Sequence, residues 1–148
     1  MRPRHIRTVA VLILLGGCSA GGDDPAASAD GWSIAPGFYS NVAQGADNGE
    51  YRGVEVHLAE GSESKTIEIV RCDGWCGQVE RQPLRRGLNG VSFAFVAGER
   101  TVDVAITPDG ADTVELTADW GDGVVSQPLK RVAGPVGLAA ARGAPPAE

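Results

Sequence analysis

The sequence predicts an all-β fold, a small antiparallel meander of roughly seven or eight strands. Three observations predict it. Apolar residues recur at every second position in several runs, Gly-rich turn signals separate these runs, and no stretch carries a sustained helical stripe. The chain has 148 residues, of which 43% are hydrophobic and 21 are glycine, so it has room for one domain with flanking segments.

Five runs alternate apolar and polar residues, as strands with one buried and one exposed face do. The expected buried positions are Val54, Val56 and Leu58; Ile67 and Ile69; Val91, Phe93 and Phe95; Val102, Val104 and Ile106; and Val114 and Leu116. Weaker strands are predicted at 37–41, 78–81 and 124–132. Pro128 in the last of these indicates an edge position or a bulge, because proline cannot donate a ladder hydrogen bond. Strands that follow one another in the sequence are expected to pair.

Such a meander can close as a barrel or fold as a sandwich. A closed barrel of about eight strands has an interior that side chains fill or that holds one small ligand. Because the predicted inward side chains are all apolar, the sequence favours a packed core over a hydrophobe pocket of the lipocalin type. The likeness of the predicted fold to lipocalins is one of architecture only.

The first 17 residues have the features of a signal peptide. Three arginines give a positive start, residues 8–15 form an apolar run, and two glycines precede Cys18. The run is far shorter than the ~20 residues that span a bilayer, so it predicts export rather than a membrane helix. An ordinary secretory signal cut after Ala20, or no processing, are the alternatives.

The end of this segment, Leu15-Gly16-Gly17-Cys18, resembles the lipobox of bacterial lipoproteins. The resemblance implies that the chain is cut before Cys18, that this cysteine carries a diacylglycerol thioether, and that its amino group is acylated. The lipid would then anchor the protein to the membrane. Ser19 stands where an aspartate retains enteric lipoproteins in the inner membrane, so the resemblance implies a cell-envelope protein of the outer membrane that faces the periplasm.

Two segments flank the predicted β domain of residues 37–132. Residues 18–36 hold mainly Gly, Ala, Ser, Asp and Pro, and we expect a lipidated cysteine followed by a flexible tether with a reach of about 25 Å. Residues 133–148 are rich in Ala, Gly and Pro and predict a disordered tail.

Cys72 and Cys76 form an even pair in a chain that is expected to be exported, which predicts a disulfide. It should stabilise the fold by about 2 kcal/mol and pin a turn between two strands. A redox pair and a metal site are the alternatives. Thioredoxin-type pairs have two intervening residues where this pair has three, and His57 would be the only further soft ligand in the mature chain. No metal or cofactor is expected.

The three tryptophans are predicted to lie outside the alternating apolar positions. Aromatic residues in loops with Asp and Gly can stack on a sugar ring, anchor a protein interface, or fold back as lids over the core. Nearby arginines could supply charges at the rim of such a surface, or form a solvated face. The residues of this candidate binding surface are Trp75, Trp120, Arg81, Arg85 and Arg86.

Catalysis and nucleic-acid binding are not expected. His57 is predicted on the exposed face of a strand, and no nucleophile motif accompanies it. Glu55 and Glu68 can approach each other across a sheet, but both are predicted to face solvent, where burial does not tune a pKa. Nineteen Asp and Glu against thirteen Lys and Arg argue against a phosphate-backbone partner.

The sequence therefore predicts a non-enzymatic, lipid-anchored domain of the cell envelope with a binding or structural role. Its expected partner, apart from the membrane, is an envelope protein or a cell-wall glycan. An inhibitor of a periplasmic hydrolase, which would insert Trp75 into an enzyme cleft, and a carrier of a small hydrophobic ligand are the two alternatives.

Overall fold

The computed structural model describes residues 34–59 and 66–143. The predicted signal peptide, Cys18, Trp32 and most of the predicted tether lie outside these ranges. The elements are β1 (Gly37–Ser40), β2 (Ala43–Gln44), β3 (Tyr51–Leu58), β4 (Thr66–Cys76), β5 (Glu80–Pro83), β6 (Arg85–Gly87), β7 (Gly90–Ala97), β8 (Arg100–Pro108), β9 (Thr113–Asp119), β10 (Val124–Val132) and α1 (Gly137–Ala141). The all-β class is confirmed, with more strands than predicted because β2 and β6 are short additions, while β5 lies close to the strand predicted at 78–81.

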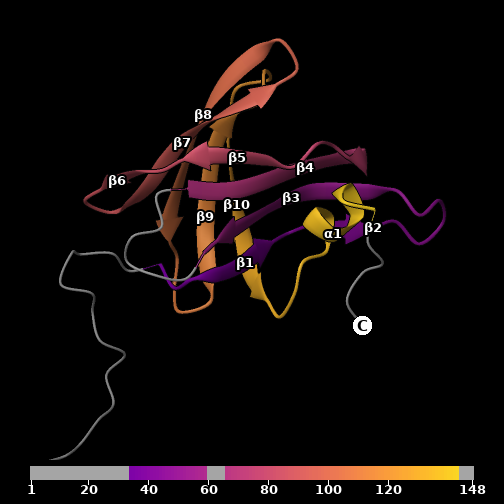
Figure 1. Cartoon of the computed structure of the whole chain (residues 1–148), viewed down its shortest axis with the longest axis horizontal. Helices are drawn as coiled ribbons and strands as arrows, with labels where there is room; N and C mark the ends of the chain where they lie inside the picture. Colours follow the sequence, from indigo (N-terminus) through magenta and orange to yellow (C-terminus); the bar gives the residue numbers. More distant parts are fainter. Residues whose placement is uncertain (1–33, 60–65, 144–148) are drawn as a thin grey trace, which may run out of the picture.

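The strands form one antiparallel sheet in the order β5-β4-β3-β1-β10-β9-β8-β7-β6, with β2 paired to β3 (Figure 1). The sheet curls, but it is not closed into a barrel and is not divided into the two sheets of a sandwich. Sequential strands pair from β3 to β5 and from β6 to β10, as predicted. The prediction is wrong for β1, which joins these two groups because Tyr39 pairs with both Val56 and Arg131.

The predicted inward positions form the core. All five alternating runs place their apolar residues in one cluster, in which Val56, Ile69, Ile106 and Leu116 are fully buried. This follows from the period of two, which puts every second side chain on the concave face of the curled sheet. Leu129 from β10 completes the cluster.

The convex face of the sheet carries α1, which packs on β3 and β4 (Figure 1). Leu138 is fully buried against Val70 and Cys72, and a Cβ added at Gly137 would lie only 3.2 Å from Cys72 Sγ. The predicted disorder is therefore wrong for residues 133–143, because Leu138 and the small residues around it fit closely onto the sheet. The tether prediction is also wrong at its end, where Ile34 is buried in the core.

No helix within residues 34–59 and 66–143 is long and apolar enough to cross a membrane.

The two ends of the strand order belong to one extended segment, residues 80–87. β5 pairs with β4, and after Leu84 the chain pairs with β7 as β6. Leu84 packs against the core, and the Glu80 carboxylate accepts a hydrogen bond from the Val96 N–H at 3.2 Å. We call this junction, formed by residues 80–87 and the facing part of β7, the closed seam.

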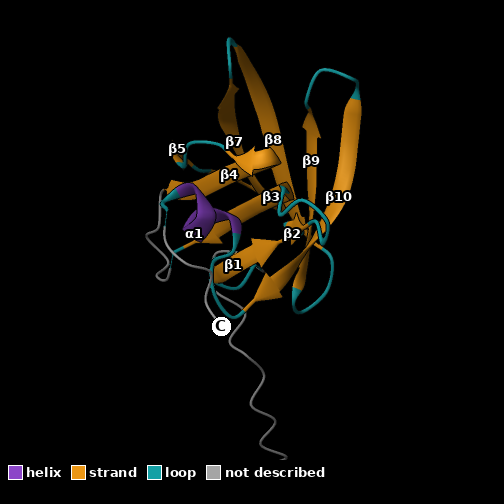
Figure 2. Cartoon of the chain, turned by 90° about the vertical axis from the view of Figure 1, so that its right-hand side faces the viewer, coloured by secondary structure: helices purple, strands orange, loops and turns teal. Residues whose placement is uncertain are grey.

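A second junction lies between β3 and β10. The short strand β1 holds them together only as far as Ser40, which pairs with Glu55 and Lys130. β2 then pairs with β3 and, within the described residues, no strand pairs with the same edge of β10 over Val124–Gln127. Figure 2 shows β9 and β10 turning away from β3 and β4 at this place. We call the gap between Tyr51–Val54 and Val124–Gln127 the open seam.

Candidate binding cleft

A cleft of about 270 Å³ opens at the open seam. One wall comes from β3 and β4, and the other comes from the β9–β10 hairpin. The side chains that give the cleft its character are Arg52, Arg71, Asp73, Trp120, Val125 and Gln127. The cleft therefore combines an apolar surface with two cations and one carboxylate.

Trp120 closes the inner end of the cleft. Its ring meets Phe95 edge-on, with ring centroids 5.7 Å apart, and packs against the core. The Arg71 guanidinium lies 5.1 Å from the Trp120 ring centroid, an arrangement in which the ring attracts the cation. Of the three roles that the sequence allowed for a tryptophan, Trp120 has that of a lid over the core.

Trp75 does not line the cleft. It lies near the end of β4, two positions beyond Asp73, and its side chain is 78% exposed. The structure thus separates the two tryptophans of the predicted surface, one as a core lid and one as a free indole.

The predicted Cys72–Cys76 disulfide is present. Both cysteines belong to β4. The prediction that the bridge pins a turn between two strands is therefore wrong. Gly74, at a φ of +87°, allows the strand to bend inside the bridge, and the Gly77 N–H donates to the Arg71 carbonyl at 3.0 Å. Within the described residues, no group of three or more His, Cys, Asp and Glu side chains is placed to hold a metal ion.

The three predicted rim arginines lie at the closed seam. Arg81 is on β5, while Arg85 and Arg86 are on β6. The cleft is lined by none of them. Charged side chains on terminal strands discourage pairing with other chains, which is a sufficient role for these residues. The structure therefore divides the predicted binding surface into separate regions.

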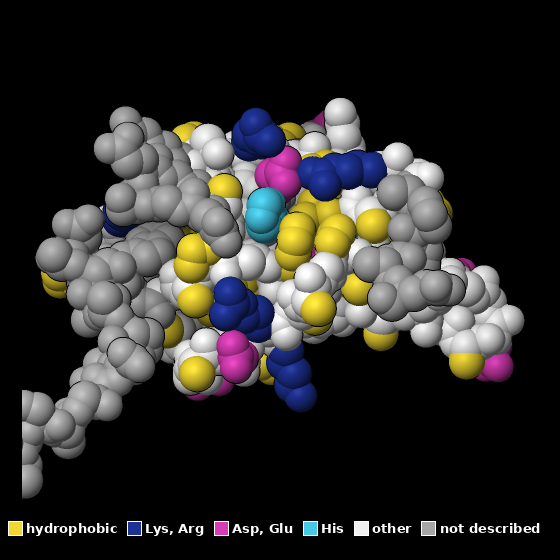
Figure 3. Space-filling model, turned by 60° about the horizontal axis from the view of Figure 1, so that its bottom comes forward, with side chains coloured by type: hydrophobic (Ala, Val, Ile, Leu, Met, Phe, Trp, Pro, Cys, Tyr) yellow, Lys and Arg dark blue, Asp and Glu magenta, His cyan; other side chains and the backbone are white. Residues whose placement is uncertain are grey.

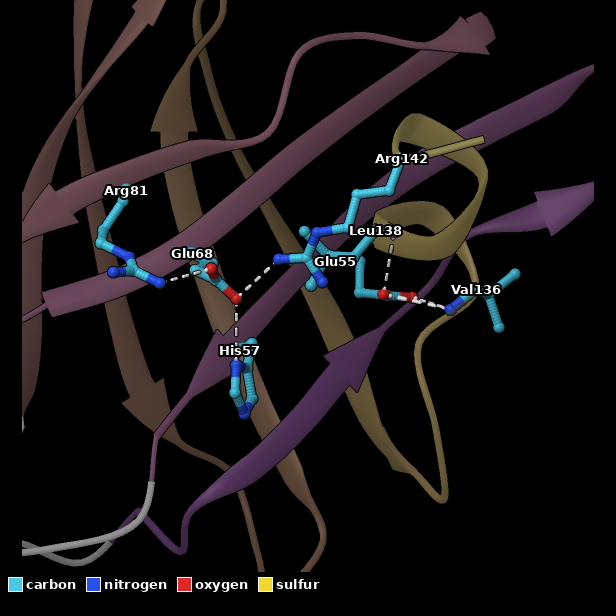
Figure 4. Close-up of polar contacts among 7 residues, drawn as sticks. All are labelled: Glu55, His57, Glu68, Arg81, Val136, Leu138 and Arg142. Carbon is cyan, nitrogen blue, oxygen red and sulfur yellow. Dashed lines mark hydrogen bonds and ion pairs between the residues drawn. The ribbon is translucent and has the colours of Figure 1, made fainter. Parts of the chain in front are cut away.

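Glu55 is fully buried, and the prediction that it faces solvent is wrong. Its carboxylate accepts hydrogen bonds from the N–H groups of Val136, Gly137 and Leu138 at 3.0 to 3.1 Å. Figure 4 shows the bonds from Val136 and Leu138. These are N–H groups at the start of α1, which have no partner inside the helix. The alternation of β3 could not reveal this, because the donors come from a segment about 80 residues further along the chain.

Glu68 occupies the centre of a second polar group on the same face of the sheet (Figure 4). It contacts Arg81 and Arg142 at 3.0 Å each and His57 Nδ1 at 3.2 Å. Burial raises the pKa of Glu68, but the hydrogen bonds from Arg81, His57 and Arg142 outweigh it and lower that pKa to about 2. Glu68 is thus ionised at neutral pH and links β5, β3 and the end of α1.

His57 is half-buried, because its ring stacks on Phe38 with centroids 4.2 Å apart. Beside it lies a groove of about 670 Å³ that reaches Arg131. Arg131 is already engaged, since it donates to the Pro36 carbonyl at 2.6 Å and pairs with Asp112 at 3.7 Å. Figure 3 shows the histidine on this face beside acidic and basic side chains.

Comparisons of the chain with protein-family models, with curated proteins and with solved structures found no match. Function therefore has to be inferred from the chemistry of the site.

Proposed function

We propose that the chain is a non-enzymatic binding domain of the bacterial cell envelope, anchored to the membrane through lipid on Cys18, and that the open-seam cleft binds a partner protein. The observation that carries the proposal is the exposed cation of Arg52 in this cleft. The Arg52 side chain is 74% exposed and pairs with Glu50 at 3.5 Å, which is a weak ion pair because both side chains are exposed to solvent.

The polar groups outside the cleft support a binding role over catalysis. Glu55 uses both of its oxygens to hold α1, and Glu68 uses both of its oxygens on Arg81, Arg142 and His57. A general acid or base needs a free position that can exchange a proton with a substrate. Both carboxylates are instead occupied by groups that hold the fold together.

A protein partner fits the cleft better than a glycan. Sugar rings bind by stacking on an open aromatic face. The Trp120 ring already holds Arg71 against it and meets Phe95 edge-on, whereas the neighbouring Val125 offers an apolar contact at the rim. Apolar contact combined with exposed arginine is typical of protein interfaces.

The anchor and the binding site are tested separately. Mass spectrometry of the mature amino terminus should find an acylated Cys18, and a Cys18→Ser variant should lack the acyl mass. A photo-crosslinking residue at position 125 should give a discrete adduct with a second protein in intact bacteria. The same residue at position 103, an exposed site on β8, should give none. Equal adducts from both positions would contradict a specific cleft.

A second function is favoured by Trp75, which stands exposed beside the disulfide. An indole held on a disulfide-bridged segment can enter the cleft of a periplasmic hydrolase. We expect a Trp75→Ala variant to lose inhibition about tenfold or more against such an enzyme while it keeps the unfolding midpoint of the parent chain. Unchanged inhibition in Trp75→Ala would exclude this role for the indole.

A further inference from the structure

The edge of β10 at the open seam directs backbone groups into the cleft. On its other side, toward β9, the Arg131 N–H donates to the Asp112 carbonyl at 2.7 Å. Successive residues of a strand direct their N–H groups to opposite edges. Within Val124–Gln127 the odd-numbered residues therefore point their N–H groups to β9, and the even-numbered residues point theirs into the open seam.

Pro128 fits this assignment. Its position is even-numbered, so the N–H that proline lacks would have pointed into the seam and not to β9. The predicted edge position of Pro128 is confirmed, because β1 pairs with β10 only from Lys130 onward. The ladder to β9 continues from Lys130 to Val124 without a break in register.

Between Val124 and Gln127 this edge lacks the arginines and proline that protect the others. At the closed seam, β5 and β6 carry Arg81, Pro83, Arg85 and Arg86, and arginine and proline on an edge discourage the addition of a further strand. Over Val124–Gln127 the residues are two valines, a serine and a glutamine. Val124 is 74% exposed and Val125 is 43% exposed. An uncharged, exposed edge is a template for strand addition.

We propose that Val124–Gln127 accepts an extended segment of the partner protein as an additional β-strand, and that this segment alternates apolar and acidic side chains. The proposal rests on the proposed function, in which the cleft binds a protein. Backbone hydrogen bonds to Val124 and Ser126 supply affinity, and alternate side chains supply specificity. Acidic side chains in the segment complement the charge of the cleft, because two arginines, Arg52 and Arg71, line it and only one carboxylate, Asp73, does.

Substitutions at Ser126 test strand addition. Ser126→Pro removes an N–H that points into the seam and leaves the β9 ladder intact, as Pro128 does. Ser126→Ala is the matched control, since it removes the hydroxyl contacts to Glu115 and Thr117 but keeps the N–H. The probe is a blocked heptapeptide of alternating valine and glutamate, titrated into the purified full-length chain in detergent. We expect Ser126→Pro to weaken binding about tenfold and Ser126→Ala less than about threefold.

The charge of the partner is tested with Arg52→Glu, a substitution at an exposed side chain that leaves the backbone edge unchanged. We expect it to weaken the valine–glutamate peptide several-fold and to strengthen a valine–lysine peptide. An N-methylated valine–glutamate peptide, which lacks the required N–H groups, should bind no variant. Failure of the valine–glutamate peptide to bind the parent chain, or equal binding by all variants, would overturn the proposal.

Two further outcomes separate this proposal from others. A dimer of the full chain that Ser126→Pro dissociates would show that the edge serves a second copy, and would overturn the partner strand. An adduct from position 125 that forms equally in Ser126→Pro and Ser126→Ala would leave the proposed function standing and exclude strand addition. Absence of any adduct would count against the proposed function, while the peptide titration would still decide whether the edge accepts a strand.

Discussion

The closed seam and the open seam are two junctions of the same curled sheet, and they differ in how well the chain covers them. At the closed seam one continuous segment reaches from β4 to β7, Leu84 fills the space beneath it, and Glu80 bonds across it to Val96. At the open seam β1 stops at Ser40 and leaves a cleft beside an uncharged edge. The closed seam thus adds contacts to the core, and the open seam is the junction that we propose for recognition.

Asn41 is the residue that ends the bridge at the open seam. Its N–H donates to the Val54 carbonyl at 3.1 Å, and its side-chain oxygen accepts the Val54 N–H at 2.7 Å. Gly53 makes this approach possible, because a Cβ there would lie 2.7 Å from the Asn41 carbonyl oxygen. These contacts turn the chain toward β3 and away from β10. Only a side-chain bond from Asn41 Nδ2 to Gln127 Oε1, at 2.9 Å, reaches across the seam in this group.

The largest effect is expected from the brace behind the open seam. The β3–β4 wall is supported on its outer face by α1, which Glu55 holds through buried charged hydrogen bonds. Glu55→Gln should lower the free energy of unfolding by about 3 kcal/mol. The glutamine amide replaces one acceptor oxygen by an NH₂ group, which would face the N–H groups at the start of α1 and could not accept their hydrogen bonds. Urea titration measures this loss. The exposed Glu99→Gln is the control, and an equal effect in both variants would show that Glu55 does not hold α1.

Paired truncations compare the two seams directly. Leu84→Ala at the closed seam should cost about 2 kcal/mol, since Leu84 packs against the core. Val125→Ala at the open seam should change the free energy of unfolding by less than about 0.5 kcal/mol, because Val125 is 43% exposed and lies outside the core cluster. The urea midpoints of the two variants, compared with that of the parent chain, measure the two losses of stability. A larger loss for Val125→Ala would reverse the roles assigned to the two seams.

Acid should remove the stability that the ion pairs of Glu68 contribute near the closed seam. The folded-state pKa of Glu68 is about 2, below its usual 4.5, so its ionised form contributes stability that is complete above pH 4.5 and disappears as pH falls toward 2. The contribution is about 1 kcal/mol, because Arg81 and Arg142 are themselves well exposed to screening solvent. Unfolding free energies measured across this range should fall less in Glu68→Gln than in the parent chain. Parallel curves would contradict the assigned pKa.

Local alternation was sufficient to predict most of the sheet. Residues such as Val56, Ile69 and Ile106 are buried where the period of two placed them, because that period is a property of each strand alone. The position of β1 between β3 and β10 could not be predicted, since pairing between distant strands leaves no periodic signal. The helix α1 was missed because five residues are too few to show a helical stripe.

The site was less predictable than the fold. The sequence identified the Cys72–Cys76 bridge and selected Trp120, which lines the cleft. It grouped Arg81 with the tryptophans because Arg81 follows Trp75 closely in the sequence, whereas the sheet places Arg81 beside Glu68. Arg52 was missed, because nothing in its local sequence shows that β1 ends before reaching it. Pro128 was the one available signal for the free edge of β10.

Amide hydrogen exchange over residues 124–127 of the free full-length chain tests most directly whether the open seam carries an uncovered strand edge. We expect the Ser126 amide to exchange roughly tenfold or more faster than the Val125 and Gln127 amides, because only the latter two bond to β9. Equal protection of all three amides would show that the edge is already covered. Equally fast exchange would show that β10 is not held by β9, and either result would contradict a strand-accepting seam.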